Sequence, residues 1–388
     1  MSDLSAGEVA LGSLLDASHR LHPDDVGKEV ARRAAMVGAA GAVLWVVDRQ
    51  QRVLTRLDDH SQTLEVNSSL AGRAYRTGAV VLAEDGRRAC FPLLDGTERV
   101  GVLTAELAST DAVTMVRCRQ LASLAAELIV TKRAYGDGPV LAERRREMDV
   151  SAEMRWALMP PLTFATDVVT LAGALEPAYE IAGDTFDYSA SGDTLHFAVF
   201  DAMGHGLWAA RMANLAVVAY RNARRHGLGL VETLAFVQDT VVEQFGAEAT
   251  FVTAHLGRLS MGTGRLSLLN AGHPRPLLLR GMRSVSEVPC DRGLPIGVAE
   301  VEERTAVVTE LPLEPGDGVL FYSDGVTEAR SPEGEEFGEE RLADFLVRAA
   351  ASGETPSEMM RRLTHAVLEH QNDRLDDDAT LLIIHWSP

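Results

Sequence analysis

Apolar and polar positions alternate with two different periods, which divide the chain into a mixed first half and a strand-rich second half. Helical spacing over residues 8–38 is followed by patterns typical of strand, turn and strand, then of a short helix, a strand and a hairpin turned at Asp95 and Gly96. Leucines at helical spacing predict a closing helix over residues 111–134. This order predicts a complete small α/β domain over residues 1–137.

A break that contains glycine and proline, YGDGPV, separates this segment from the next. Residues 138–162 are charged in their first half and apolar in their second, which predicts one amphipathic linker helix that Pro160 and Pro161 stop. Such a helix could transmit a signal or pair two chains in a homodimer. A plain connector packed on one neighbour fits the same pattern.

Strand patterns dominate from Val168 onward, with four helical stretches between them. Short turns such as MGTG join several strands, so the sheets should be largely antiparallel. Strands enough for two sheets, with helices grouped in pairs, predict an α-β-β-α sandwich over residues 163–388. The expected fold class of the whole chain is α+β.

Composition and charge indicate which kinds of partner the protein is not expected to bind. The chain has 388 residues, enough for two domains, and 56 acidic against 37 basic residues give a formal net charge of -19. That charge repels nucleic acid and anionic membrane surfaces. No run of about eighteen apolar residues occurs, and the three cysteines show no CxxC spacing. We therefore expect a cytoplasmic protein that binds neither nucleic acid nor a membrane.

Acidic residues stand at the ends of several predicted strands, beside small residues; they are Asp184, Asp201, Asp324, Asp377 and Asp378. Carboxylates at strand ends can converge at one rim of a sandwich. Two such charges about 4 Å apart repel by roughly 4 kcal/mol at an effective dielectric of 20, which divalent cations would relieve. An all-oxygen site favours Mg²⁺ or Mn²⁺, and two or more such ions would support hydrolysis of a phosphoester. Taken singly, each aspartate also fits a turn former or a helix cap.

Five motifs occur in the order and spacing of a known family: AGDTFD, VFDAMGHG, LLNAGHPRP, LFYSDGVTEAR and DDDATLLII. They resemble the motifs of metal-dependent serine/threonine phosphatases of the PPM class, in its bacterial SpoIIE-like and RsbU-like branch. The resemblance covers about residues 165–386. One departure is Ala182 before Gly183, where the family commonly has a glycine pair.

The resemblance implies a set of site residues. Asp184 and Asp201 would bind and bridge the central metal pair, and they would act in catalysis, with the carbonyl of Ala202 as an added ligand. Asp324 and the acidic pair Asp377 and Asp378 would complete the cluster. Within that pair Asp377 is favoured, because the family places its metal acid three residues before a hydroxyl residue, here Thr380.

Four further residues have open roles. Asp187 would point to the opposite face of a straight strand from Asp184, so either a bulge turns it toward the site or it satisfies a backbone amide. His205 could donate a proton to the leaving alkoxide, or it could bond a loop at a helix start. His273 could order the site from a neighbouring loop, whereas Thr253 matches a family position that looks structural.

The first half resembles the GAF family of small-ligand sensor domains through its hairpin, its LAGRAYRTG helix start and its long closing helix. Together the two resemblances imply a protein phosphatase that a small ligand or a protein regulates through the GAF-like domain. Its implied substrate is a phosphorylated STAS-domain antagonist of an anti-sigma factor, in partner-switching signalling. Two alternatives stay open: a non-catalytic sensor that binds a partner through the same fold, and a phosphoesterase for small molecules.

Overall fold

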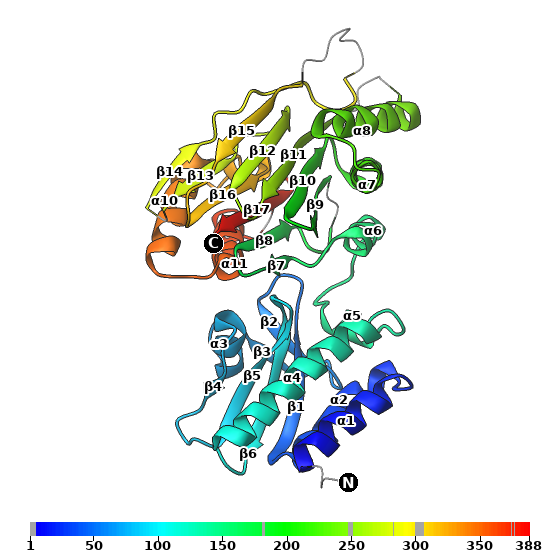
Figure 1. The fold of residues 1–388 in the computed structure, drawn as a ribbon, viewed down its shortest axis with the longest axis vertical. Helices are drawn as coiled ribbons and strands as arrows, with labels where there is room; N and C mark the ends of the chain where they lie inside the picture. Colours follow the sequence, from blue (N-terminus) through cyan, green and yellow to red (C-terminus); the bar gives the residue numbers. More distant parts are fainter. Residues whose placement is uncertain are drawn as a thin grey trace. The chain divides into compact units, whose positions relative to one another are not determined.

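The chain folds into two units in the computed structural model, and each unit is described by itself (Figure 1). They comprise Met1–Glu147 and Met148–Pro388. The structure describes residues 5–180, 183–246, 251–281, 283–298, 306–373, 375 and 377–388. None of the helices within these residues has the length and apolar character that crossing a membrane requires.

The first unit is built on one antiparallel sheet of six strands. In spatial order the strands are β3 (Thr63–Glu65), β2 (Val53–Arg56), β1 (Ala39–Val47), β6 (Glu98–Leu107), β5 (Arg88–Asp95) and β4 (Val81–Leu82). The hairpin between β5 and β6 turns at Asp95 and Gly96, as the sequence predicts, and Gly96 has a φ of 58°, which glycine adopts without strain.

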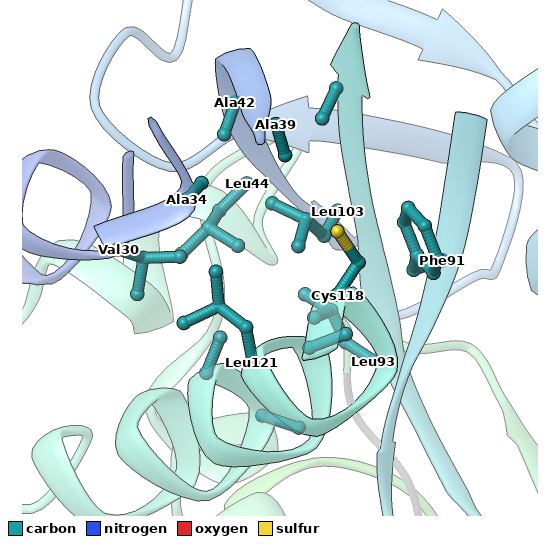
Figure 2. Close-up of a cluster of buried hydrophobic side chains, with 14 of the residues drawn as sticks. Val30, Ala34, Ala39, Ala42, Leu44, Phe91, Leu93, Leu103, Cys118 and Leu121 are labelled. Carbon is teal, nitrogen blue, oxygen red and sulfur yellow. The ribbon is translucent and has the colours of Figure 1, made fainter. Parts of the chain in front are cut away.

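Helices cover both faces of this sheet. They are α1 (Ala6–Ser18), the 3₁₀ turn η1 (Pro23–Asp25), α2 (Val26–Met36), α3 (Leu70–Thr77), α4 (Ala112–Lys132) and α5 (Gly138–Ala142). Figure 2 shows the core in which Leu121 and Cys118 of α4 face Val30 of α2 and the sheet residues Leu44 and Leu103. The helix α3 contributes Tyr75 to a separate cluster of buried side chains, which also contains Trp45 of β1. The elements predicted for the first half are therefore present, and the GAF-like assignment stays a prediction.

The linker differs from the single helix that its pattern predicts. Residues 138–162 contain two short helices, α5 and α6 (Val150–Leu158), and they belong to different units. The reason lies at Glu143, a buried residue just beyond α5 whose carboxylate pairs with Arg49 and Arg133 of the first unit. The backbone carbonyl of Glu143 also accepts from the N–H of Arg49 at 3.0 Å, so it bonds outside the helix, and α5 ends there. Periodicity alone carries no information about such distant partners.

The second unit contains two antiparallel sheets. One sheet has the order β15 (Val308–Pro312), β12 (Arg265–Ala271), β11 (Val252–Ser260), β10 (Thr194–Ala202) and β9 (Asp184–Ser191). The other has the order β14 (Ser284–Glu287), β13 (Leu277–Arg280), β16 (Asp317–Tyr322), β17 (Ala379–Trp386), β8 (Val169–Glu176) and β7 (Thr163–Ala165).

Helix pairs cover the outer faces of the two sheets (Figure 1). The helices α7 (Gly206–Arg225) and α8 (Leu230–Phe245) pack on the first sheet through a core that includes Phe200 and Tyr220. The helices α10 (Gly338–Ala351) and α11 (Pro356–His370) pack on the second sheet, and the short α9 (Asp324–Thr327) follows β16. Phe197 and Phe321 meet between the sheets, with ring centroids 4.9 Å apart. The predicted α-β-β-α sandwich is confirmed.

Candidate active site

Two of the predicted aspartates face each other across neighbouring strands. Asp184 begins β9 and Asp201 lies near the end of β10, and the two residues are direct partners in the antiparallel register. Directly opposite residues project from the same face of a sheet. Phe197 and Val199 lie four and two residues before Asp201 on β10, so they project from the same face of the sheet as Asp201. Both side chains lie in the core between the two sheets. Asp184 and Asp201 therefore point into the space between the sheets, at its rim.

The opposite sheet supplies the other three carboxylates. Asp324 is the first residue of α9, directly after β16, and Asp377 and Asp378 directly precede β17, the neighbour of β16. Asp378 joins the two sheets, because its Oδ2 accepts hydrogen bonds from the backbone N–H groups of Gly183 and of Asp184, the latter at 3.2 Å.

Two glycines permit this close approach. A Cβ atom on Gly183 would lie 2.3 Å from the carbonyl oxygen of Ala202, and one on Gly325 would lie 1.9 Å from the carbonyl oxygen of Asp378. Both distances are well inside van der Waals contact with backbone, so a side chain would push the strand ends apart. The small residues beside the acids thus have a steric purpose. Ala182, the departure from the family pattern, lies outside the described residues.

The acids raise one another's pKa. Burial, and then the charges of Asp201 and Asp378, raise the pKa of Asp184 well above its usual range, although the hydroxyls of Ser323 and Thr380 partly offset this. Burial, followed by Asp324 and Asp377, raises the pKa of Asp201 to about 7. These influences run between residues of both sheets. The structure therefore gathers all five predicted carboxylates into one electrostatic cluster.

Burial also raises the pKa of Asp378 to about 7, with Asp377 adding to the rise, whereas Arg155 and the two backbone N–H groups lower it. The pKa of Asp324 is raised by loss of water contact and by the neighbouring Asp377. Asp324 and Asp377 are the exposed members of the cluster, and Asp184 and Asp378 are its buried members. Negative charge is therefore least favourable at the buried end of the cluster, and its open end faces solvent.

The cluster suits a cation. Asp184 is buried, yet its Oδ2 has no hydrogen-bond partner among the described residues. A buried carboxylate oxygen without a partner is costly, and a hard divalent ion that prefers oxygen ligands would satisfy it. Within the described part of the chain, no group of three or more Asp, Glu, His or Cys side chains already has the arrangement of a metal site. The ligand set is therefore a proposal.

Asp187 does not join the cluster. The register of β9 with β10 continues without a bulge, so Asp187 lies on the opposite face from Asp184. There its carboxylate is buried against α7 and accepts hydrogen bonds from Arg221 at 2.7 and 3.0 Å and from Arg224 at 3.0 Å. Neither a bulge nor a backbone amide explains this residue. It forms a buried ion pair with α7.

His205 is exposed at the N-terminal end of α7, four residues after Asp201. It is the N-cap residue of that helix, but its side chain makes no capping hydrogen bond. Its imidazole has no hydrogen-bond partner within the part of the chain that the structure describes, and its role stays a prediction.

Thr253 contacts the cluster directly, and His273 reaches it through Thr253, as one of the two roles open for His273 in the sequence would have it. Thr253 is the register partner of Asp201 on β11, and its hydroxyl donates to Asp201 Oδ2 at 3.3 Å. His273 Nδ1 lies 2.7 Å from the same hydroxyl. The hydroxyl and the imidazole thus share one hydrogen bond, whose donor is set by the tautomer of His273. Asn270 holds the loop of His273 through hydrogen bonds to its backbone N–H and carbonyl.

These four layers, with acids from both sheets at one rim, define a phosphatase fold of the PP2C type. The solved SiaA-PP2C domain of Pseudomonas aeruginosa has this fold, with a TM-score of 0.51 and 22% identity over 61% of this chain and 94% of that domain. The family model described as Stage II sporulation protein E (SpoIIE) matches residues 191–387. The chain therefore belongs to the SpoIIE family. The matched range includes Asp201, Asp324 and Asp377 and begins after Asp184.

Two curated proteins are also similar to this chain. Phosphoserine phosphatase RsbU of Bacillus subtilis is 23% identical over 243 residues, which cover 62% of this chain and 70% of RsbU. Protein IcfG of Synechocystis is 25% identical over 238 residues, which cover 54% of this chain and 37% of IcfG. The chain thus spans little more than a third of the length of IcfG.

Proposed function

We propose that this protein is a metal-dependent phosphatase that removes phosphate from serine or threonine of a protein substrate. The observation that carries the proposal is the convergence of Asp184 and Asp201 from one sheet with Asp324, Asp377 and Asp378 from the other. The orphaned oxygen of Asp184 and the membership in the SpoIIE family support it.

The proposed ligands divide into two groups. Asp184, Asp201 and the carbonyl of Ala202 would hold the Mg²⁺ or Mn²⁺ ions from one sheet, and Asp324 and Asp377 would hold them from the exposed end of the cluster. When bound, such ions polarise phosphoryl oxygens and lower the pKa of water, which makes the water a nucleophile at neutral pH. Asp378 already accepts two backbone N–H groups, so it mainly fixes the start of β9 and is the weaker candidate ligand.

The chain's own residues would supply orientation and a proton. Thr253 holds the Asp201 carboxylate by its hydroxyl, and His273 holds Thr253 in turn. His205, exposed at the start of α7, would donate a proton to the leaving alkoxide of serine or threonine. The open end of the cluster near Asp324 would admit the phosphorylated side chain.

We infer the substrate and setting from the family resemblance. A phosphorylated STAS-domain antagonist of an anti-sigma factor would be the substrate, in partner-switching signalling in the cytoplasm. The similarity to RsbU, a phosphoserine phosphatase, supports a phosphoserine substrate. The first unit, as a GAF-like sensor that could pair in a homodimer, would regulate the reaction by binding a small ligand or a protein.

A comparison of the wild-type chain with Asp324→Asn tests the enzymatic proposal. We expect Mn²⁺-dependent hydrolysis of an aryl phosphate by the wild type and a fall of about 100-fold or more in the variant, because a ligand carboxylate is lost. The exposed Asp344 on α10 provides a matched control as Asp344→Asn, which should retain full activity. Turnover of a phosphorylated STAS-domain protein is then compared with that of free phosphoserine.

Three outcomes separate the candidate functions. Loss of activity in Asp324→Asn alone, with preference for the phosphoprotein, supports the proposal. Equal turnover of free phosphoserine would favour a small-molecule phosphoesterase. Absence of any metal-dependent hydrolysis by the wild type would contradict the enzymatic proposal and favour a partner-binding role.

A further inference from the structure

A charged side chain lies buried behind the acid cluster, on the helix α6. Arg155 is 2% exposed and is among the largest fully buried side chains of the protein. Its Nη2 donates to the carbonyl oxygen of Pro177, whereas its Nε and Nη1 have no hydrogen-bond partner among the described residues. A buried guanidinium that is only partly hydrogen-bonded is costly, so a nearby negative charge must retain it.

Three carboxylates supply that negative charge. Burial lowers the pKa of Arg155, and the charges of Asp378, Glu176 and Asp184 oppose this in that order. Two of these, Asp184 and Asp378, belong to the acid cluster. The register of the sheet agrees with this, because Glu176, the residue before Pro177, is the direct partner of Ala379, which follows Asp378. The guanidinium, bonded at Pro177, is thus a positive charge at the strand end where the proposed metal ligands gather.

The position of Arg155 is fixed by its helix. Trp156 Nε1 donates to the carbonyl oxygen of Ala178 at 2.8 Å, and the backbone N–H of Asp149 donates to the carbonyl oxygen of Tyr179 at 3.0 Å. These bonds attach α6 to the segment that leads from β8 toward Asp184. Arg155 therefore cannot leave the cluster without breaking contacts between α6 and that segment.

We propose that Arg155 is an internal counter-charge of the acid cluster that opposes divalent cations and so sets their affinity; this rests on the proposed metal-dependent function. The guanidinium attracts the carboxylates in the metal-free protein, and it repels a divalent cation bound to the same carboxylates. The guanidinium repels a divalent cation, which carries two positive charges, more strongly than it attracts a single carboxylate at a similar distance. Its net effect is therefore to oppose metal binding. Arg155 is thus a positioning residue that stabilises the metal-free state and weakens metal binding.

A purely structural role for Arg155 predicts the opposite result. If the side chain only held the Pro177 carbonyl, its replacement would loosen the start of β9 and weaken metal binding. Glutamine keeps a donor for that carbonyl and removes the charge, whereas lysine keeps the charge and changes the shape. The two substitutions therefore separate charge from packing.

The experiment measures Mn²⁺ binding by isothermal titration calorimetry on the full chain after removal of metal by a chelator. We expect Arg155→Gln to bind Mn²⁺ at least about tenfold more tightly than the wild type, and Arg155→Lys to bind within about threefold of it. The melting temperature of metal-free Arg155→Gln should fall, while its rise on addition of Mn²⁺ should exceed that of the wild type. Arg225→Gln, an exposed residue in the last turn of α7, controls for net charge.

Unchanged or weaker Mn²⁺ binding by Arg155→Gln, beside a wild type that binds metal and hydrolyses phosphoesters, overturns this inference alone. A wild type that binds no Mn²⁺ and shows no metal-dependent hydrolysis overturns the proposed function and this inference with it. If Arg155→Gln does not fold, Arg155→Lys decides, because an affinity that changes more than about threefold contradicts a role for the charge.

Discussion

At the scale of single residues, His255 is a histidine that the second unit buries completely. Its ring is fully buried, packs edge-on against the rings of His273 and Phe321, and contacts the carbonyl oxygen of Pro274 through Nε2 at 2.8 Å. Burial lowers the pKa of His255 to about 4, and Arg292 adds to this, although the Pro274 carbonyl opposes it. A neutral imidazole is thus built into the second unit.

This burial predicts how stability depends on pH. Between about pH 6.5 and pH 4 the unfolded chain binds a proton at residue 255 and the native protein does not, so the free energy of unfolding falls as pH falls. The loss at pH 4 should be about 3 kcal/mol from His255 by itself. Urea unfolding across this range should show a shallower fall for His255→Gln, whose amide can still donate to Pro274.

His226, exposed at the end of α7, provides the matched control as His226→Gln. That variant should follow the wild type across the whole range. Parallel curves for the wild type and His255→Gln would show that the buried imidazole does not couple folding to protons.

At the scale of elements, a buried ion pair ties three parts of the second unit together. Arg221 of α7 donates both to Asp187 of β9 and to the carbonyl oxygen of Leu158, the last residue of α6. Arg224 adds a second cation to the same carboxylate. An acidic residue stands at position 187 because it pairs with arginines of α7, a partner that the pattern of the strand itself does not show. Asp187 holds α6 and α7 against the sheet that carries the acids.

We expect Asp187→Asn to destabilise the second unit by about 3 kcal/mol, because two partly buried arginines lose their counter-charge. The stabilisation by Mn²⁺ should persist, since Asp187 lies on the opposite face from the acid cluster. Urea unfolding with and without Mn²⁺ measures both effects. Asp239→Asn, an exposed change on α8, is the control. A variant of normal stability that no longer responds to Mn²⁺ would instead make Asp187 a ligand.

At the scale of the whole molecule, the boundary between the units lies before α6. Ser151, Ala152 and Arg155 of this helix are buried within the second unit. A fragment that begins at residue 163 therefore lacks a helix that belongs to the sandwich, although the linker pattern suggests that start.

We expect a fragment of residues 163–388 to be less stable than one of residues 148–388 by about 2–5 kcal/mol, because loss of α6 exposes apolar surface and the Arg221 ion pair. Thermal and urea unfolding of both fragments measure this difference. Comparison of 148–388 with the full chain then tests regulation, since a regulatory first unit should change Mn²⁺-dependent turnover by more than about threefold. Equal stability of the two fragments would contradict the assignment of α6.

Much of the architecture followed from the sequence because local patterns determine local elements. Alternation along residues 194–202 and 252–260 predicts strands, and the strands β10 and β11 are there. The motifs also pointed to five aspartates that the structure gathers at one rim. The single helix expected over residues 138–162 was wrong, because the pairing of Glu143 with Arg49 depends on residues far away in the chain.

By itself the sequence determined most of the strands and helices outside residues 138–162, which fold class they build, and which acidic residues stand beside glycines at strand ends. Only the tertiary structure decided the surroundings of those acids: the hydroxyl of Thr253 on Asp201, the bonds from Gly183 and Asp184 to Asp378, the arginines around Asp187, and the charge of Arg155 behind the cluster. The physical reason is that periodicity reports burial along one element, whereas hydrogen bonds and charges act between elements that only packing brings together.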